Sequence, residues 1–589
     1  MKKKNLIINL LSIFITVMII FAFTACLSFN AMTESELAKF FDTSNGFPAT
    51  LSNSFKVYGF ANPVATQAFG ADPTALVYND RVYLYMSNDT FLYDASGNVH
   101  YLTQTGSTFS YGKGIQGIRV ISSSDLVNWT CHGAFNITGP ENTNPLIDSD
   151  EWEDSQLLEI SGVNRSWAPT AAWKMINGKP KFFLYWGNGG NGVSVVTADS
   201  PTGPWTYPLG REMLITRNTP NCRNVHYLFD PGVVIDDEGN GYLFFGGGDN
   251  LESAGPGATM ADTKMARRVK LNPDMISLAE DPEQWNVPYL FEANEIARIG
   301  GKYYYMYSTH NQTQGNPYGL RNTVLAYMVS SDGPFGNYSA PKVLLEHPQR
   351  ALGTQDSNNH GVMFEFKGQP YIAYHTQMLA EAMGIFRYRA THIDKMTIDG
   401  NGMIAEVPLT RKGVEQVGHI NPFIVNEAET IGIQGGIYTR PHNGAGNKTV
   451  VTSIDSGDWI VVYGVDFGDG AKKFTAKVRM PEGADYTGAI ELRLNPEADG
   501  HTDANTNLNA TNRTTRIKGG EVIGRVPVQA ASGKRGKFIT IKIDLNKTVT
   551  GVNDLVFVFY SSLGEKPLTI FPDNRHKNAF EFDQWQFHK

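Results

Sequence analysis

The segment Ile299-Gly-Gly-Lys-Tyr-Tyr-Tyr-Met-Tyr307 joins a glycine turn to a short aromatic strand, and the chain repeats this unit four more times. The other copies are Tyr78-Asn-Asp-Arg-Val-Tyr-Leu-Tyr85, Ile176-Asn-Gly-Lys-Pro-Lys-Phe-Phe-Leu-Tyr185, Asp237-Glu-Gly-Asn-Gly-Tyr-Leu-Phe-Phe245 and Phe366-Lys-Gly-Gln-Pro-Tyr-Ile-Ala-Tyr374. Hairpin turns need residues that tolerate positive φ, and aromatic strands need a partner sheet to cover them. The repeat therefore predicts small sheets arranged around an axis, as a five-bladed β-propeller.

A polar residue precedes each copy at a nearly constant offset. These residues are Asp72, Thr170, Asp230, Glu292 and His360. Equivalent positions in propeller blades lie at equivalent heights around one axis, so the repeat predicts polar groups that converge on one central spot. Three of the five are carboxylates that begin apolar strands, where a charged group has to be paired, metal-bound or catalytic.

The composition narrows the class of protein. With 589 residues, 41% of them apolar and 12% aromatic, the chain can bury a large core. Helix signals are sparse, so we expect an all-β protein. The formal net charge of −8 leaves no basic face for phosphate backbones, which argues against nucleic acid as a partner. A neutral polymer fits better.

The texture of the sequence divides the chain into four stretches. Residues 1–26 have the layout of a signal peptide, and 27–55 form a polar linker. The repeats fill 56–415, the predicted propeller. After a loop, strands alternate cleanly, as in Lys473-Phe-Thr-Ala-Lys-Val-Arg479, and are separated by turns at intervals typical of a sandwich. We therefore expect a separate β-sandwich (jelly-roll) domain over 422–589.

The N-terminus predicts export, to the cell surface or the medium. Three lysines precede an apolar run from Leu6 to Phe23, and Phe23-Thr-Ala-Cys26 is similar to a bacterial lipoprotein processing site. Phe stands there where Leu, Val or Ile is usual, so a lipid anchor to the membrane, a simple cleaved signal and an uncleaved anchor all stay open. Exported proteins often pair their thiols, and the sequence leaves a bridge between Cys131 and Cys222 open as well.

Three acids around one axis suit the hydrolysis of glycosidic bonds. That reaction needs one group to protonate the leaving oxygen and another to activate water on the opposite face of the sugar. Neighbouring like charges raise the pKa of the carboxyl that is less well hydrogen-bonded, so one acid can stay protonated while another stays ionised.

Several motifs together resemble glycoside hydrolase family 43. They are Asp72-Pro, Asp230-Pro-Gly-Val-Val, Phe291-Glu-Ala before the tyrosine strand, Asn359-His-Gly361, Ser123-Ser-Asp-Leu-Val-Asn-Trp129 and Ser200-Pro-Thr-Gly-Pro-Trp205. The resemblance implies that Asp72 is the general base, that Glu292 is the general acid, and that Asp230 tunes and orients that acid. It also implies inversion of the anomeric centre, with a gap of about 6.5–9.5 Å between base and acid. Glu295 is the rival acid, and Glu292 is preferred because it keeps the repeat offset.

The resemblance suggests further site residues in the propeller. His360 matches a histidine that helps to hold a central ion, commonly calcium, although a buried core histidine is the simpler reading. Arg389 resembles an active-site arginine, with Arg387 as its competitor. Trp167 resembles an aromatic residue that stacks on substrate, and blade packing is the alternative. Many relatives carry Asp where Thr170 stands, which puts the shape of the sugar pocket in doubt.

The C-terminal stretch resembles carbohydrate-binding modules of family 6. The resemblance makes Glu427, Glu429 and Asp583 ligands of a structural calcium. Trp459 and Trp585 are expected in the core. Around Ser532-Gly-Lys-Arg-Gly-Lys-Phe538 the expected sugar-stacking Trp is missing, and Glu581 stands where Asn is usual. Tyr438 is the remaining candidate for stacking on sugar, so the module binds weakly, binds through another cleft or acts as a spacer.

The layout looks most like that of arabinoxylan arabinofuranohydrolases, which remove arabinose branches from this plant cell-wall polysaccharide. We therefore expect an exported, inverting α-L-arabinofuranosidase. Two alternatives remain: an exo-β-1,4-xylosidase of the same fold, and a non-catalytic protein that captures polysaccharide at the cell surface.

Overall fold

The computed structural model describes most of the two predicted domains. The described residues are 51–89, 115, 117–136, 165–210, 212–385, 387–442, 449–482, 484, 487–499, 515–529, 534–562 and 578–589. The predicted signal peptide and Cys26 lie outside them, as does most of the linker. No helix in the described part of the chain has the length and apolar character needed to cross a membrane.

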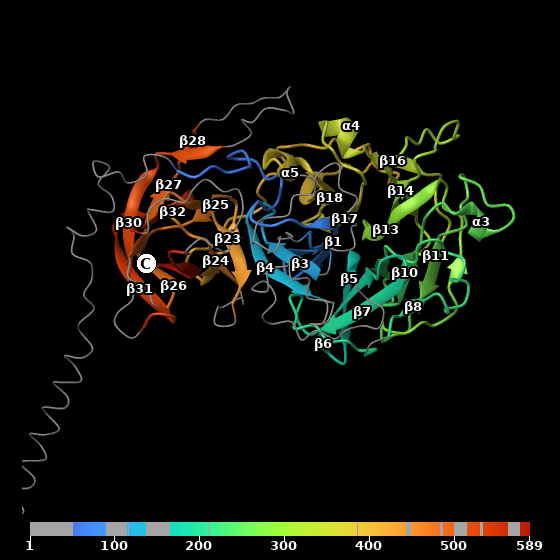
Figure 1. Ribbon diagram of the computed structural model, residues 1–589, viewed down its shortest axis with the longest axis horizontal. Helices are drawn as coiled ribbons and strands as arrows, with labels where there is room; N and C mark the ends of the chain where they lie inside the picture. The colour runs from blue at the N-terminus through green and yellow to red at the C-terminus, as the bar shows by residue number, and fades with distance from the viewer. Residues whose placement is uncertain are drawn as a thin grey trace, which may run out of the picture.

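Residues 71–395 form five antiparallel sheets, which are the blades of the propeller (Figure 1). The first blade consists of β1 (Ala71–Tyr78), β2 (Arg81–Ser87), β3 (Gly117–Ser123) and β4 (Trp129–Asn136). The second consists of β5 (Trp167–Ile176), β6 (Lys179–Gly187), β7 (Gly192–Ala198) and β8 (Ile215–Thr216). The third consists of β9 (Gly232–Ile235), β10 (Gly241–Phe245), β11 (Arg267–Lys270) and β12 (Glu283–Gln284). The fourth consists of β13 (Leu290–Ile299), β14 (Lys302–Thr309), β15 (Leu325–Ser330) and β16 (Lys342–Leu345), and the fifth of β17 (Gly361–Phe366), β18 (Gln369–Thr376) and β19 (Ala390–Lys395).

The innermost strands close a ring. Each first strand contacts the first strand of the next blade, in the order β1, β5, β9, β13, β17 and back to β1. The chain before β1 runs beside β19, where Val64 N–H donates to Thr391 O (2.9 Å) and Gly70 N–H donates to Arg389 O (3.0 Å). Joining the two ends of the propeller in this way brings the start of β1 next to β19. The five-bladed propeller predicted from the repeats is confirmed.

Aromatic strands pack between the blades, as the repeat predicts. Tyr305 on β14 is buried against Phe244 on β10, with ring centroids 5.5 Å apart, and against Trp285, with centroids 4.7 Å apart and ring planes at 74°. Edge-to-face aromatic pairs of this kind add about 0.5–1.5 kcal/mol beyond the burial of their area. The aromatic side chains therefore hold neighbouring sheets together and keep the ring closed.

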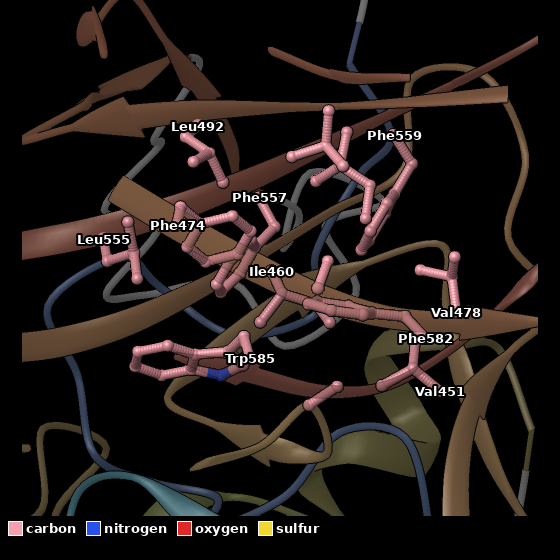
Figure 2. Packing of buried hydrophobic residues seen from close by; sticks show 14 of the residues in the cluster. Val451, Ile460, Phe474, Val478, Leu492, Leu555, Phe557, Phe559, Phe582 and Trp585 are labelled. Atoms are coloured by element: carbon pink, nitrogen blue, oxygen red, sulfur yellow. The ribbon is translucent and has the colours of Figure 1, made fainter. Parts of the chain in front are cut away.

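Residues 426–588 form the predicted β-sandwich. Its strands are β20 (Asn426–Glu427), β21 (Thr430–Ile431), β22 (Ile433–Gly435), β23 (Tyr438–Pro441), β24 (Thr449–Thr452), β25 (Trp459–Asp466), β26 (Ala471–Arg479), β27 (Gly488–Leu494), β28 (Glu497–Asp499), β29 (Arg516–Lys518), β30 (Glu521–Val528), β31 (Phe538–Val549), β32 (Val552–Ser561) and β33 (Glu581–His588). One sheet has the order β23-β24-β33-β26-β31 and the other has the order β22-β25-β32-β27-β30. Phe474, Phe557 and Trp585 meet between the sheets (Figure 2), which confirms Trp585 as a core residue.

Helices are few and short. The described ones are α3 (Leu251–Ala254), α4 (Pro348–Leu352) and α5 (Met378–Ala382). α5 lies between β18 and β19, and it buries Met378, Leu379 and Ala380. The all-β fold class is confirmed.

Backbone pairing joins the sandwich to the first blade. β21 of the sandwich pairs with the outer strand β4 of the propeller, with Thr430 opposite Thr130. Asn128 lies in the Ser123–Trp129 motif, and it both donates to Tyr463 O (2.9 Å) and accepts from Tyr463 N–H (2.8 Å). A motif that resembled family 43 thus serves to dock the second domain.

Residues 51–59 lie across the outer face of the β22-β25-β32-β27-β30 sheet. Trp459, on that face of β25, donates from Nε1 to Ser52 O (2.7 Å), so it packs in the interface between the domains and not between the two sheets. Lys56 is buried and donates to Gly432 O (3.0 Å), and Tyr58 donates to Asp554 (2.8 Å). Residues 51–59, which precede the propeller in the chain, therefore pack against the C-terminal module.

No disulfide joins Cys131 to Cys222. Cys131 lies in β4 of the first blade, and Cys222 lies in the loop that leads to the third blade. Both side chains are buried. Burial raises the pKa of the Cys222 thiol to about 11, so at neutral pH it stays protonated and unreactive.

Candidate active site

The register of the blades corrects the equal-offset prediction. A β-bulge follows one paired residue near the start of each of three inner strands, and these residues are Ala71, Trp167 and Glu292. The next paired residues are Thr74, Thr170 and Glu295. Glu292 therefore corresponds to Ala71 and not to Asp72, and Thr170 corresponds to Glu295. The offset was wrong because sequence spacing does not show the register of the strands.

Asp72 and Asp230 do share one backbone conformation. Their φ angles are +48° and +47°, in the left-handed region that Asp tolerates better than most residues. Ala168 and Ala293 have the same conformation in the second and fourth blades. Asp72, Asp230 and Glu292 nevertheless meet, because Glu292 extends from one position before the shared site with a longer side chain.

The Asp72 carboxylate is buried and held at both oxygens. Oδ1 accepts from Arg389 Nη1 (2.8 Å), and Oδ2 accepts from Ser87 Oγ (2.8 Å). Burial alone would raise the pKa of Asp72, but the Arg389 guanidinium, together with His375 and His360, holds that pKa well below its usual range. Asp72 is therefore ionised at neutral pH, as a general base must be.

Arg389 reaches the site and Arg387 does not. The Arg389 side chain is almost fully buried between Asp72 and a second carboxylate, Asp89. Asp89 accepts from Arg389 N (2.9 Å), Nε (3.0 Å) and Nη2 (2.9 Å). Arg387 is exposed. The structure thus favours Arg389, the predicted residue, over its competitor.

Asp230 links the third and fourth blades. Its Oδ2 accepts from Ala293 N–H (2.7 Å), directly after Glu292. Burial raises the pKa of Asp230 to about 7, and the Asp72 charge adds to this increase, while the Ala293 hydrogen bond opposes it. Asp230 therefore changes charge near neutral pH, next to the predicted acid.

Glu292 has the environment of a general acid. It is half-buried, and no hydrogen bond to its carboxylate is present among the described residues. Burial raises its pKa to about 8, and the charges of Asp230 and Asp72 contribute to that increase. Glu292 is thus protonated at neutral pH and partly open to a substrate.

Glu295, the rival acid, is buried against the inner strands. Its exposed fraction is 2%, and Oε2 accepts from Thr170 Oγ1 (3.3 Å) and Ile296 N–H (3.2 Å). Burial raises the pKa of Glu295 to about 8 as well. Glu295 can hold a proton, but it lacks the access to a sugar that Glu292 has. Access, and not the repeat offset, is the reason to prefer Glu292.

His360 and His375 flank Asp72. His360 Nδ1 lies 3.9 Å from Asp72 Oδ1, and burial lowers its pKa to about 4, so the ring is neutral at pH 7. His375 Nδ1 accepts from Asp72 N–H (3.0 Å), which places its proton on Nε2, facing Asn358 Oδ1 (3.2 Å). Both rings form part of the wall around the base.

Trp167 lies next to the acids. It begins β5, it is half-buried, and the Arg165 guanidinium stacks over its ring at 5.3 Å. The following residue, Ala168, donates its N–H to Ser87 Oγ (2.9 Å), the same hydroxyl that donates to Asp72. This position suits contact with a sugar, and that role stays a prediction.

The predicted calcium ligands do not gather into a metal site. Within the described residues, no group of three or more His, Cys, Asp or Glu side chains is placed to hold a metal ion. In the module, Lys477 Nζ lies 2.5 Å from Asp583 Oδ2, and Glu427 accepts from Gln584 (3.1 Å). Glu429 is buried. An ammonium on Asp583 does not fit a calcium ligand, so calcium in the module stays a prediction that these contacts do not support. Calcium at His360 also stays a prediction.

The sugar-binding prediction for Tyr438 meets a similar difficulty. Tyr438 is half-buried on β23, a strand that packs against β4 of the propeller. Glu581 occupies the position where Asn is usual in such modules, and it pairs with Arg440 and with Arg479 Nη1 (2.8 Å). Glu581 therefore cannot supply the amide that an Asn would present to a sugar, and both of its oxygens are already paired with arginines. Binding through Tyr438 stays a prediction.

Sequence reasoning missed three residues of the site: Ser87, Asp89 and His375. Ser87 and Asp89 follow the first aromatic strand in the run Ser87-Asn-Asp89, and all three members of this run are buried. Consecutive polar residues that end an apolar strand were a usable signal, because buried polar groups need partners. The partners themselves, Asp72 and Arg389, lie far away in the sequence and could not be read from it.

Comparisons agree with this architecture. Residues 60–404 match the family model of glycosyl hydrolases family 43, and 427–589 match that of carbohydrate binding module family 6. The chain is 37% identical over 538 residues to an arabinoxylan arabinofuranohydrolase of Paenibacillus polymyxa, covering 90% of this chain and 75% of that protein. It is 36% identical over 549 residues to an arabinoxylan arabinofuranohydrolase of Bacillus subtilis (strain 168), covering 92% and 95%. A crystal structure of a Bacillus subtilis family 43 arabinoxylan arabinofuranohydrolase in complex with cellotetraose superimposes with a TM-score of 0.75 at 35% identity, covering 91% of this chain and 99% of that one.

Proposed function

Since the chain belongs to glycosyl hydrolase family 43, we propose that it removes α-L-arabinofuranosyl side chains from arabinoxylan by a single displacement that inverts the anomeric centre. The family membership that the sequence motifs predicted is thus confirmed. The observation that carries the proposal is the pairing of an ionised Asp72 with a protonated Glu292 around one site. The names and the extent of the two similar enzymes support the choice of arabinoxylan.

Each acid has one task in this mechanism. Asp72 takes a proton from water as the oxygen attacks the anomeric carbon. Glu292 gives its proton to the xylan oxygen as the arabinose leaves. Burial raises the pKa of Glu292, and Asp230 raises it further as its own carboxyl ionises near pH 7, so Glu292 keeps its proton. Arg389 and Ser87 fix the direction of the Asp72 carboxylate.

Product analysis tests the substrate. We expect free arabinose from wheat arabinoxylan, and no xylose from linear xylan oligomers. NMR of the fresh product should show the β-anomer, because a single displacement inverts an α-linkage. Xylose from the oligomers would favour the exo-β-1,4-xylosidase, and binding to polysaccharide without any release would favour the capture protein.

The pH dependence of the reaction follows from the raised pKa values of Glu292 and Asp230. Glu292 loses its proton as the pH rises through about 8, so kcat/KM should fall there, while Asp72 stays ionised far into the acidic range. Asp230→Asn removes a charge that raises the pKa of Glu292, so the alkaline limb should move to lower pH. A pH–rate profile of both proteins checks this, and an alkaline limb that stays in place or moves up would contradict the role of Asp230.

The remaining proposals concern location and ions. Export, with a lipid anchor at Cys26 or without one, is supported only by the residues before the described ones. The C-terminal module supports a polysaccharide partner. Calcium is assigned no part in the reaction.

A further inference from the structure

We propose that Asp89 is a positioning residue of this active site, which fixes the Arg389 guanidinium so that only one of its nitrogens reaches Asp72. The inference rests on the proposed glycosidase activity. It assigns a role to a side chain that lies outside the three acids and outside the family motifs found in the sequence.

Asp89 accepts hydrogen bonds from three nitrogens of Arg389. Its Oδ2 accepts from the Arg389 backbone N–H (2.9 Å) and from Nε (3.0 Å), and its Oδ1 accepts from Nη2 (2.9 Å). A guanidinium is a rigid plane, so two nitrogens bound to one carboxylate determine where the third one points. That third nitrogen, Nη1, donates to Asp72 Oδ1 (2.8 Å).

A single contact with Asp72 matters for the chemistry of a base. A carboxylate offers about four lone-pair sites on its two oxygens. Arg389 and Ser87 each use one of them. Without Asp89, the guanidinium could turn and bind both oxygens of Asp72 at once, which is the usual geometry of an Arg–carboxylate pair. The lone pairs that a water molecule needs would then be occupied.

Burial makes the arrangement rigid. Arg389 and Asp89 are both buried, with exposed fractions of 1% and 6%. A buried guanidinium needs partners for its charge and its N–H groups, and here two carboxylates share them. Removing Asp89 leaves Nε and Nη2 without these acceptors, so Arg389 must move to find others. Asp72 is the other carboxylate that Arg389 already reaches.

Both restraints on Asp72 come from one short stretch of chain. Ser87 ends β2 and donates to Asp72 Oδ2, and Asp89, two residues later, holds the arginine that donates to Oδ1. Between them, Asn88 accepts from Arg119 Nε (3.0 Å), which itself donates to Phe69 O (3.1 Å) near the start of β1. The Ser87–Asp89 run thus restrains both carboxylate oxygens of Asp72, one directly through Ser87 and one through Arg389.

Asp89→Asn tests the proposal through kinetics. We expect kcat to fall by about 10²-fold with KM nearly unchanged, because a shift of about 1 Å in a catalytic group has an effect of that order. The groups that face Asp72 are Arg389, His375, His360, Asp230 and Glu292, and the substitution changes none of them. If Arg389 leaves Asp72, only the acidic limb of the pH–rate profile should move, and it should move upward; if Arg389 binds both oxygens of Asp72, only the acidic limb should move, and it should move downward. Loss of the Asp89 charge without displacement would move both limbs downward, and that result would overturn the proposal.

A double-mutant cycle tests whether Asp89 acts through Arg389. If it does, the combination of Asp89→Ala with Arg389→Ala should lose no more activity than Arg389→Ala alone. Losses that multiply would show an independent role and would also overturn the proposal. Asp394→Asn is the matched control, since Asp394 is a buried carboxylate on β19 that binds Tyr374 (2.6 Å) and Thr410 (2.9 Å to N) and not Arg389. It should lower stability without moving the acidic limb.

A crystal structure of the Asp89→Asn protein separates this proposal from the proposed function. We expect the guanidinium of Arg389 to turn, so that it binds both oxygens of Asp72 or leaves that residue. An arginine that keeps its wild-type contact would refute the positioning role whatever the substrate is. A wild-type protein that releases no arabinose would refute the function alone.

Discussion

Asp72→Asn should reduce arabinose release from arabinoxylan by about 10²–10⁴-fold, the usual contribution of a general base. The amide has almost the same shape as the carboxylate, but it cannot accept the proton of the attacking water. Asp72 is the one acid of the three whose surroundings hold its pKa well below the usual range, so no neighbour can replace it as an ionised base at neutral pH. The measurement is arabinose released under kcat/KM conditions.

Binding and stability serve as controls for this variant. Affinity electrophoresis in arabinoxylan gels should show retardation similar to that of the wild type, because the substitution leaves Trp167 and the C-terminal module in place. The melting temperature should be compared as well, since Asp72 takes part in a buried ion pair with Arg389. Release within a few-fold of the wild-type rate in a folded protein would remove Asp72 from the role of base.

Glu292→Gln and Glu295→Gln should give opposite results. Glu292→Gln takes away the proton donor, and a loss of about 10²–10⁴-fold is expected. Glu295 holds a proton at neutral pH, is almost fully buried and accepts hydrogen bonds from Thr170 and Ile296. A neutral amide preserves most of that environment, so Glu295→Gln should keep most of the activity. Arabinose release from arabinoxylan measures both effects.

The leaving group distinguishes loss of an acid from damage to the fold. An aryl arabinofuranoside with an acidic phenol needs little protonation as it leaves, so Glu292→Gln should lose much less activity on this substrate than on arabinoxylan. A general disturbance would reduce both activities equally. If Glu295→Gln shows the substrate-dependent loss instead, the two glutamates exchange roles.

The fold was predictable because its signals are local. A glycine turn followed by a strand such as Lys302–Thr309 identifies itself within ten residues, and five copies indicate a closed ring. The alternation in Ala471–Arg479 likewise places Phe474, Ala476 and Val478 inside the sandwich. The contact between the two domains was not predictable. It depends on Asn128 meeting Tyr463, a pair separated by 335 residues.

The three acids of the site were found by a partly mistaken route. Charged residues at the start of apolar strands were a sound signal, since burial demands a reason for each of them. The repeat offset was not, because the strand register makes Glu292 equivalent to Ala71 and not to Asp72. Sequence spacing counts residues along the chain, whereas the direction of a side chain depends on φ, and only coordinates show that Asp72 and Asp230 share a positive φ.

The supporting residues were out of reach for a different reason. Asp89 and Arg389 lie 300 residues apart, and they meet because the chain before β1 closes the ring beside β19. Thr170 was noted as a departure from Asp. In the structure its hydroxyl links two blades, because it donates to Glu295 and accepts from Val233 N–H (3.2 Å). Each partner was visible in the sequence, but its pairing was not.

The course of residues 51–59 over the module affects how the module's role can be studied. A protein cut after residue 415 would lose Gly432 and Asp554, the acceptors for Lys56 and Tyr58, and it would uncover the edge of β4 that Thr430 protects. Poor yield or weak turnover of such a fragment would then reflect a destabilised first blade. It would not show that the enzyme needs the module to bind polysaccharide. Surface substitutions in the intact protein are the cleaner way to ask what the second domain recognises.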